Sequence, residues 1–179
     1  KPYGDDSELE ILAIASRSPT SLVEGYNHTQ VRAWLVYISK RLDLAVIKVK
    51  GIFPIAKLSS RAPELLDNIT VIGAPYLIYP VITHGYITDL SLRILDQPKC
   101  MLISAGSGPG NSGSPVFLND GKVVGIIFAG FTKFPLVSYA LGIETIKVFL
   151  QEVSRTPEGK IFQGLLKDLP PTIEDETIP

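Results

Sequence analysis

The stretch "GSGPGNSGSPVF", residues 106–117, decides how the fold of this sequence is interpreted, because it sets small, polar and turn-forming residues between two strongly apolar runs. Those runs leave no second polar spacer beside it, which argues against a flexible linker. A phosphate-binding loop needs Lys-Ser or Lys-Thr after its last glycine, whereas Gly113 is followed by Ser114 and Pro115. An ordinary turn and a rigid loop that presents Ser112 remain as alternatives.

The rigid loop would carry chemistry. Glycines at positions 110 and 113 let the backbone turn tightly around Ser112 and aim its N–H groups at one point. Two N–H groups that converge beside a serine oxygen form an oxyanion hole, in which one donor stabilises the transition state by about 3 kcal/mol. The stretch is therefore a candidate nucleophile loop.

The composition excludes several classes of function. Hydrophobic residues make up 45% and charged residues 20% of the 179 residues, which is ample for a core. A net charge of −1 gives no basic field for nucleic acid, and the most apolar stretch, 15 residues from Ile69 to Thr83, is too short to insert into a membrane. The single cysteine, Cys100, allows neither an internal disulfide nor a cysteine-based zinc site, and it favours an intracellular or other disulfide-free setting.

Short apolar runs rich in Val, Ile, Tyr and Phe recur along the chain and predict β-strands. They cover residues 9–16, 31–39, 44–51, 69–75, 80–90, 100–106, 114–118, 122–130 and 137–143. Asp120-Gly121 between two of these runs indicates a hairpin. From Ile143 to Val153 the apolar residues instead recur at helical spacing, which predicts one helix near the C-terminus.

This pattern predicts an all-β protein, a barrel or sandwich closed by one terminal helix. The proline-interrupted segment 53–68 is interpreted as a connection between two β-units. The expected organisation is a first β-unit over residues 1–52, this connection, a second barrel with its helix over 69–155, and a linker with a disordered acidic tail over 156–179.

Asp43 is the second candidate residue. It stands where a polar turn enters the apolar run "LAVIKV", and such an aspartate can simply begin a strand. However, an aspartate followed by a serine 69 residues later (112 − 43), with strands between them, is also the order found in one type of hydrolytic triad.

The segments "DLAVIKV" (43–49), "GPGNSGSPVF" (108–117) and "GKVVGI" (121–126) together resemble the trypsin-fold serine peptidases, in particular the bacterial branch of glutamyl endopeptidases and Deg/HtrA-type proteases. "NITVIGAP" (68–75) and "SYALGIETIKVFLQEV" (138–153) look like the second barrel and terminal helix of that family. The resemblance spans roughly residues 30 to 153.

This resemblance implies a double β-barrel that hydrolyses peptide bonds of a protein or peptide substrate through an acyl-enzyme. By the family's pattern, Ser112 matches the nucleophile, Gly110 and Ser112 match the oxyanion-hole residues, and Asp43 matches the carboxylate that orients the catalytic histidine. Neither a metal nor an organic cofactor is implied.

Neither of the two histidines fits the family's order of His, Asp and Ser. His28 precedes Asp43 by only 15 residues (43 − 28), and it is interpreted as a loop residue. His84 follows Asp43 inside a strand-like run. We therefore expect a chain truncated before the catalytic histidine, with an incomplete first barrel and almost no activity by itself.

The resemblance also implies that the strand after the nucleophile hairpin, "GIIFAGF", walls the first specificity pocket. Ile127 stands where glutamyl endopeptidases carry a histidine, and Gly106 stands six residues before Ser112, where a trypsin-like pocket would have an aspartate. An apolar pocket of Ile127, Phe128 and Ala129 with Gly106 predicts cleavage after uncharged residues; Ile126 is assigned to the core.

Two alternatives to an enzyme stay open at this point. The barrel could belong to a pseudoprotease that binds proteins and has no catalytic histidine at all. Alternatively, "GNSGSP" could be a plain turn of a non-enzymatic β-protein. Labelling of Ser112 by a fluorophosphonate would distinguish the enzyme from both. The oligomeric state is not predicted.

Overall fold

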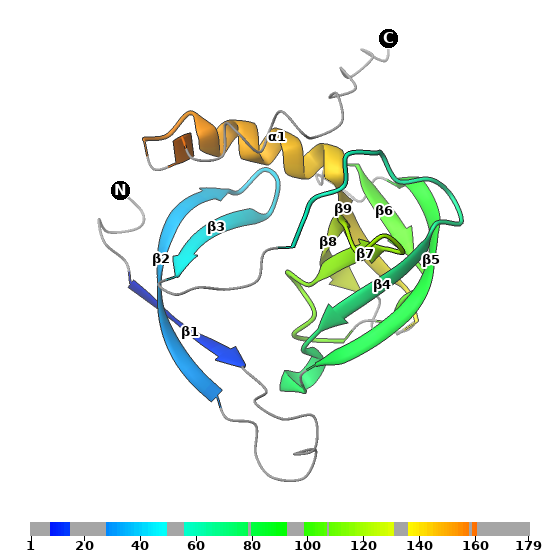
Figure 1. The fold of residues 1–179 in the computed structure, drawn as a ribbon, viewed down its shortest axis with the longest axis horizontal. Coiled ribbons are helices and arrows are strands. Elements are labelled where there is room, and N and C mark those ends of the chain that lie inside the picture. The colour runs from blue at the N-terminus through cyan, green and yellow to red at the C-terminus, as the bar shows by residue number, and fades with distance from the viewer. Residues whose placement is uncertain are drawn as a thin grey trace.

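The computed structural model describes residues 8–14, 28–49, 56–78, 80–92, 99–106, 108–130, 136–157 and 159–160. Within these ranges the chain forms nine strands and one α-helix, arranged as an open sheet, a closed barrel and a helix that covers both (Figure 1). Every apolar run that was predicted to be a strand contains one, so the prediction of an all-β fold with a C-terminal helix is confirmed.

The open sheet contains three antiparallel strands in the order β1-β2-β3. They are β1 (Glu8–Ile14), β2 (His28–Ser39) and β3 (Leu44–Val49). A tight turn at residues 40–43 joins β2 to β3, and their pairing shifts register between Leu35 and Tyr37. In the described residues the first unit is thus a sheet with two free edges and not a closed barrel.

The second unit is a closed barrel in which each strand pairs with two neighbours, in the order β4-β5-β6-β9-β8-β7. Its strands are β4 (Asn68–Gly73), β5 (Val81–Leu92), β6 (Cys100–Ile103), β7 (Pro115–Leu118), β8 (Val123–Gly130) and β9 (Ser138–Gly142). Alternating burial along β4, where Ile69 and Val71 face inward, follows from the two-residue repeat of a strand. The β7–β8 hairpin turns through Gly121 at φ +76°, which confirms the hairpin predicted from Asp120-Gly121.

The helix α1 (Ile143–Ser154) follows β9 directly, as its apolar spacing predicted. Its buried face consists of Ile143, Ile146, Lys147, Phe149, Leu150 and Val153. The acidic residue Glu144 lies in the first turn, where it interacts favourably with the positive end of the helix dipole. Figure 1 shows α1 lying across the end of the barrel and over the β2–β3 hairpin.

The β2–β3 turn is anchored to this helix. Leu42, at 2% exposure, belongs to the same apolar core as the barrel residues and α1. The rings of Tyr37 and Phe149 lie 5.9 Å apart, and both Tyr37 and Arg41 donate hydrogen bonds to the carboxylate of Glu152. Burial acts to raise the pKa of Glu152, but these hydrogen bonds outweigh it and the pKa is lowered. The open sheet therefore shares one core with the barrel.

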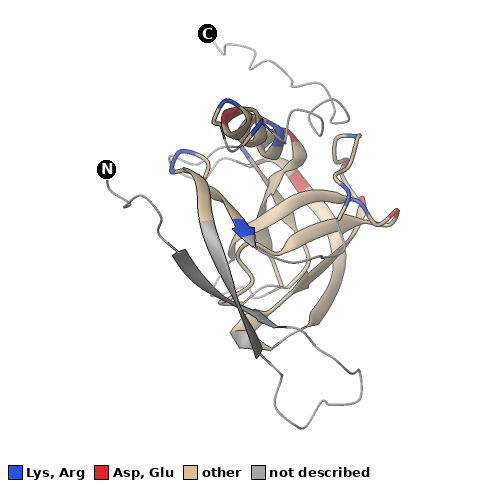
Figure 2. Ribbon diagram, turned by 60° about the vertical axis from the view of Figure 1, so that its left-hand side comes forward, with Lys and Arg blue, Asp and Glu red and all other residues tan. Residues whose placement is uncertain are grey.

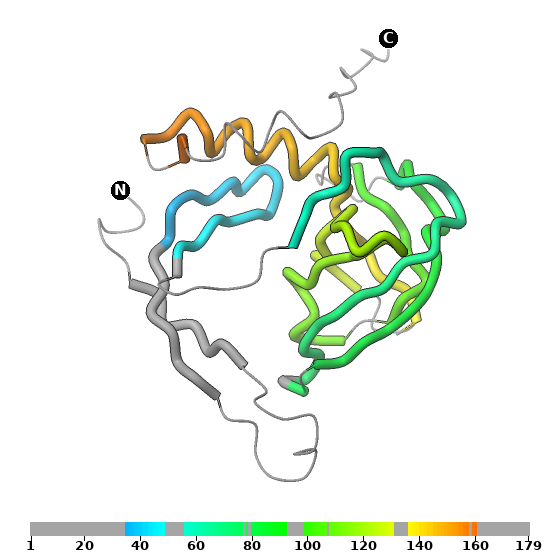
Figure 3. The backbone as a smooth tube through the Cα atoms, viewed as in Figure 1, coloured from blue at the N-terminus to red at the C-terminus, as the bar shows by residue number. Residues whose placement is uncertain are grey.

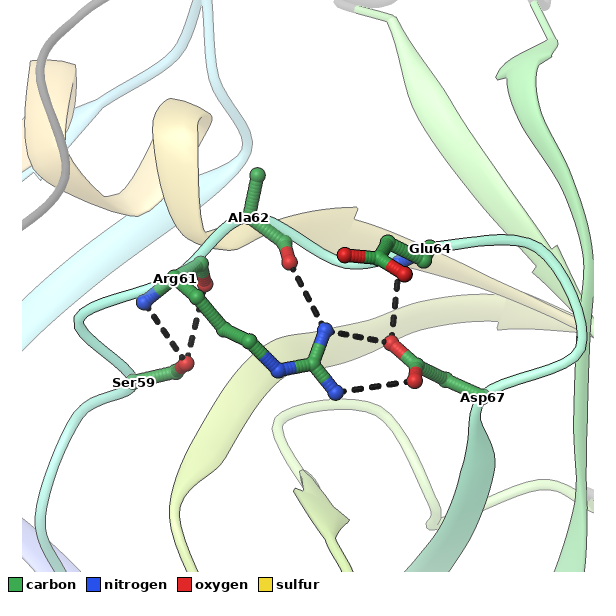
Figure 4. Close-up of polar contacts among 5 residues, drawn as sticks. All are labelled: Ser59, Arg61, Ala62, Glu64 and Asp67. Carbon is green, nitrogen blue, oxygen red and sulfur yellow. Dashed lines mark hydrogen bonds and ion pairs between the residues drawn. The ribbon is translucent and has the colours of Figure 1, made fainter.

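Residues 56–67 connect the two units along the barrel wall. Leu58 forms a parallel bridge with Val123, and the Ser59 N–H donates to the Val123 carbonyl at 2.8 Å. Arg61 then donates two hydrogen bonds of 2.8 Å to the carboxylate of Asp67, which also accepts the Glu64 N–H at 2.8 Å (Figure 4). This clamp fixes the point at which the connection enters β4.

The domain boundaries stay a prediction. Residues 161–179, which make up most of the expected tail, lie outside the described residues. So do residues 50–55, where the expected first unit ends and the connection begins at residue 53. Among the described helices, none is long and apolar enough to cross a membrane.

Candidate active site

Ser112 lies at the tip of a tight turn between β6 and β7, and its side chain is exposed. The turn needs its glycines: Gly110 and Gly113 have φ angles of +97° and +88°, a left-handed region that residues with a Cβ rarely occupy. A Cβ on Gly110 would also come within 2.8 Å of the Ala74 carbonyl oxygen. The glycine spacing seen in the sequence thus has its expected conformational role.

Two N–H groups in the backbone of this turn find no acceptor among the residues that the structure describes. The Asn111 N–H donates to the Gly108 carbonyl and the Ser114 N–H to the Asn111 carbonyl, each at 3.0 Å. The Gly113 N–H donates to the Ile127 carbonyl on β8 at 2.7 Å. The N–H groups of Gly110 and Ser112, in contrast, donate no hydrogen bond to any described residue.

The Ser112 hydroxyl donates a hydrogen bond to the Phe128 carbonyl at 3.3 Å. Phe128 occupies an irregular position of β8, because Ile127 pairs with Ala140 whereas Ala129 already pairs with Tyr139. The additional residue interrupts the ladder between these pairs. The serine is therefore held by a main-chain group of the strand that was expected to wall the substrate pocket.

Asn111 fastens the turn from inside, a role that the sequence analysis missed. It is 3% exposed, its Nδ2 donates to the Gly106 carbonyl at 3.5 Å, and its Oδ1 accepts the Ser114 hydroxyl at 3.3 Å. Gly73 packs so closely that a Cβ there would lie 2.0 Å from this Oδ1. Only the position of Asn111 directly before the serine could have pointed to it; nothing in the sequence marks Gly73 as its neighbour.

Asp43 ends the turn between β2 and β3, with φ +51° and an exposed side chain. Its carboxylate makes no hydrogen bond or ion pair with a described residue. The preceding residue, Leu42, is buried in the shared core and so holds the turn against α1. Asp43 thus stands on the sheet, and Ser112 stands on the barrel.

The residues expected to form the pocket have different surroundings. Ile127 is 2% exposed and belongs to the barrel core, because its side chain points inward at that position of β8; its contribution to a pocket stays a prediction. Phe128 and Ala129 are half-buried, and the Phe128 ring lies 6.2 Å from that of Tyr139. Gly106 is half-buried and accepts hydrogen bonds from Asn111 and Thr83.

Ile126, assigned to the core, is half-buried and packs against that core.

The two histidines and the cysteine lie on strands β2, β5 and β6, outside this turn. His84 lies on β5, exposed, with its Nδ1 2.9 Å from the Thr70 hydroxyl, which confirms it as a strand residue. His28 begins β2 and pairs with Ile14, so it is a strand residue and not the loop residue that was expected. Burial raises the pKa of the Cys100 thiol, which donates to the Leu92 carbonyl at 3.3 Å. Among the described residues, no group of three or more His, Cys, Asp or Glu could hold a metal ion.

Residues 9–126 match the family of the trypsin-like peptidase domain. This match includes both Asp43 and the nucleophile turn and covers well over half of the chain, so the chain belongs to that family.

Similar proteins within the family are of the Deg/HtrA type. The chain is 29% identical over 161 residues to a probable periplasmic serine endoprotease DegP-like of Pseudomonas savastanoi pv. phaseolicola, covering 83% of this chain and 34% of the relative. It is 31% identical over 156 residues to the protein of that name in Pseudomonas putida (strain GB-1), covering 80% of this chain and 33% of the relative. The chain thus spans about a third of the length of these relatives.

Among solved structures, it is similar to the HtrA-type protease AlgW with decapeptide, at a TM-score of 0.64 and 25% identity over 71% of this chain and 42% of that one. The serine endoprotease from Yersinia pestis gives a TM-score of 0.63, also at 25% identity, over 72% of this chain and 46% of that one.

Proposed function

We propose that this chain forms most of the catalytic region of a serine endopeptidase of the Deg/HtrA branch, with Ser112 as its nucleophile. The proposal rests on the N–H groups of Gly110 and Ser112, which have no acceptor among the described residues, whereas the N–H groups of Asn111, Gly113 and Ser114 all have one. An exposed hydroxyl beside two free donors is the arrangement that acyl transfer to serine requires.

In this mechanism Ser112 Oγ attacks the carbonyl carbon of the scissile peptide bond, and a general base removes the hydroxyl proton. The negative charge that develops on the carbonyl oxygen is stabilised by the N–H groups of Gly110 and Ser112. The base returns its proton to the departing amine, which leaves an acyl-enzyme on Ser112. The same base then removes a proton from water, which attacks the ester. The proton returns to Ser112 Oγ, and the acyl half of the substrate leaves as a carboxylic acid.

The proposed base is a histidine outside these 179 residues, oriented by Asp43. The carboxylate of Asp43 is exposed and has no partner in the described part of the chain, which supports this role. His28 begins the 12-residue strand β2, whereas Asp43 follows its end; at 3.3 Å per residue the strand would separate them by roughly 35 Å. His84 is engaged with Thr70 on β5. Without the histidine, the chain would retain only residual catalysis.

We propose cleavage after uncharged residues, with the acyl half of the substrate lying along β8. The half-buried Phe128 and Ala129 with Gly106 would contact the first side chain, and Ile127 would support them from the core. None of these residues carries a charge that could pair with Lys, Arg or Glu of a substrate. We therefore do not propose the glutamate specificity of the glutamyl endopeptidases. A peptide library cut mainly after charged residues would contradict it.

Reaction of the full-length protein with a fluorophosphonate tests the function directly. We expect labelling of Ser112 and proteolysis, both of which disappear in Ser112→Ala, with a loss of activity of about a millionfold. Ser60→Ala is the matched control, because Ser60 is an exposed serine of the connection. Proteolysis that persists in Ser112→Ala would overturn the proposal.

The alternative is a pseudoprotease that uses the barrel as a protein-binding module. The positions of His28 and His84 favour it if no other segment of the protein supplies a histidine. Full-length protein that neither reacts with the probe nor cleaves peptides, yet binds them, would support this alternative.

A further inference from the structure

Tyr76 combines a strained backbone with an exposed ring. It lies in the short 3-10 helix η1 (Pro75–Leu77), and its φ of +53° is left-handed. For a residue with a Cβ this conformation costs about 1 to 2 kcal/mol. The side chain is 69% exposed and so gains little from burial. Strain of this kind persists where the surrounding structure enforces it, and it clusters at functional sites.

The strained residue is attached to the nucleophile turn. The Tyr76 N–H donates to the Pro109 carbonyl at 2.7 Å. Its ring lies over Gly108, where a Cβ would come within 2.7 Å of Tyr76 Cε2. A Cβ on Gly110 would be 3.4 Å from the Tyr76 nitrogen. Tyr76 therefore stands beside the residues that lead into Ser112.

Two different elements flank this turn. Ser112 and Gly113 hydrogen-bond to the main chain of β8, whereas Pro109 and Gly110 contact η1. If the acyl half of a peptide lies along β8, as proposed above, the half after the scissile bond would lie on the other flank of the turn, next to η1. The Tyr76 ring lies on that flank.

The surroundings of Tyr76 suit an apolar side chain. From Asn68 to Thr88 the sequence contains no Asp, Glu, Lys or Arg. Ile78 and Ile82, which are 52% and 56% exposed, follow Tyr76 in the same segment. In Figure 2 the charged residues gather around α1 and in the turns, while most of the barrel strands carry none.

We propose that Tyr76 is a specificity-determining residue for the leaving-group half of the substrate, where its ring packs against an apolar side chain of one of the first residues after the scissile bond. This inference rests on the proposed serine endopeptidase function. The left-handed backbone of Tyr76 holds the ring toward the substrate.

The test uses the full-length protein with two kinds of substrate. The first is a peptidyl-aminomethylcoumarin, which has no amino acid after the scissile bond. The second is a pair of quenched peptides that differ only after that bond, where one carries Leu-Phe and the other Asp-Ser. Tyr76→Gly removes the ring at a position whose φ suits glycine, so it should fold at least as stably as the parent protein. Tyr76→Phe keeps the ring.

We expect Tyr76→Gly to lower kcat/KM about tenfold for the Leu-Phe peptide only, while Tyr76→Phe behaves like the parent protein. Equal losses on the coumarin and the Leu-Phe peptide would show that Tyr76 acts through the turn, and no loss on either would show that it does not touch substrate. Both results overturn the inference while the proposed function stands. A parent protein that cleaves none of the substrates and is not labelled at Ser112 overturns both.

Discussion

The six-stranded barrel and the three-stranded sheet differ in what covers their apolar side chains. In the barrel, Val116 and Ile127 are at most 2% exposed, because their side chains face the interior of the closed sheet. In the sheet, Ile38 and Ile47 are 39% and 43% exposed, although Tyr37, Leu44 and Val46 on the same strands pack against the shared core. Between residues 37 and 47 apolar side chains thus lie on both faces of the β2–β3 hairpin, but only one face packs against the core. In Figure 3 this hairpin stands beside the barrel and below α1.

This difference also separates the two candidate catalytic residues: Ser112 is fixed within the closed barrel, whereas Asp43 lies on the open sheet. The barrel fixes the Ser112 turn through Asn111 and the main chain of β8, within one closed sheet. Asp43 belongs to a sheet with free edges, and Leu42 and Arg41 attach its turn to α1. The geometry between the two candidate catalytic side chains therefore depends on α1 as well as on either sheet.

The largest effect is expected when Asp43 on the sheet is changed and catalysis by Ser112 on the barrel is measured. Asp43→Asn in the full-length protein should lower kcat by about 10⁴-fold, because the amide no longer holds the histidine in the required tautomer. Asp120→Asn, which changes an exposed turn aspartate of the barrel, should leave kcat within about twofold. Equal activity of Asp43→Asn and the parent protein in a peptide-cleavage assay would remove Asp43 from the site.

The strands, the helix and the nucleophile turn could be predicted from the sequence because their signals are local. Apolar alternation, the Asp120-Gly121 pair and the helical spacing after Ile143 each act within a few residues. The contacts of Asn111 with Gly106 and Ser114 are also local, yet their purpose depends on Gly73, which lies 38 residues earlier in the chain (111 − 73). A packing contact between residues this far apart leaves no repeating pattern in the sequence from which it could be predicted.

The position of Ile127 shows the same limit. An isoleucine suits a pocket or a core equally well. The register of β8 decides that its side chain points inward, and the sequence does not reveal that register. The left-handed backbone of Tyr76 was also beyond prediction, because neighbouring segments and not its own propensity impose it.

The second prediction compares burial in the two regions. Ile127→Ala should lower the free energy of unfolding of this chain by about 3 kcal/mol, since it leaves a cavity in the closed core. Ile47→Ala, an identical change on the exposed face of β3, should lower it by about 0.5 kcal/mol or less. Chemical denaturation monitored by circular dichroism measures both values. Equal losses would mean that the face of Ile47 is covered in solution.

The third prediction tests how the barrel holds the nucleophile turn. Gly73→Ala should lower the free energy of unfolding by about 2 kcal/mol and weaken peptide cleavage by the full-length protein, because the new Cβ displaces Asn111. Gly121→Ala loses about 1 kcal/mol from its φ of +76° alone and should leave cleavage unchanged, since nothing lies within 4 Å of the added Cβ. If both variants cleave equally well, Asn111 does not position Ser112.

The smallest effect concerns the clamp between the two regions. Hydrogen bonds from Arg61 lower the pKa of Asp67, so its carboxylate stabilises the folded chain above the unfolded pKa of about 3.9 and loses that effect as the pH falls through the lower folded value. Asp67→Asn should therefore lower the free energy of unfolding by about 1 kcal/mol at pH 7, a modest value because solvent screens the half-exposed Arg61. The difference from the parent chain should shrink progressively below about pH 4.

Glu64→Gln is the matched control for this clamp, because the hydrogen bonds between Glu64 and Asp67 use main-chain groups of Glu64, and the substitution keeps them. The Glu64 N–H donates to the Asp67 carboxylate, and the Glu64 carbonyl accepts the Asp67 N–H. Its stability should follow that of the parent chain at every pH. If the loss in Asp67→Asn were equally large at low pH, the hydrogen bonds of the clamp would stabilise the connection regardless of the charge on Asp67. The attachment between sheet and barrel would then depend on the geometry of residues 61–67 and not on their ionisation.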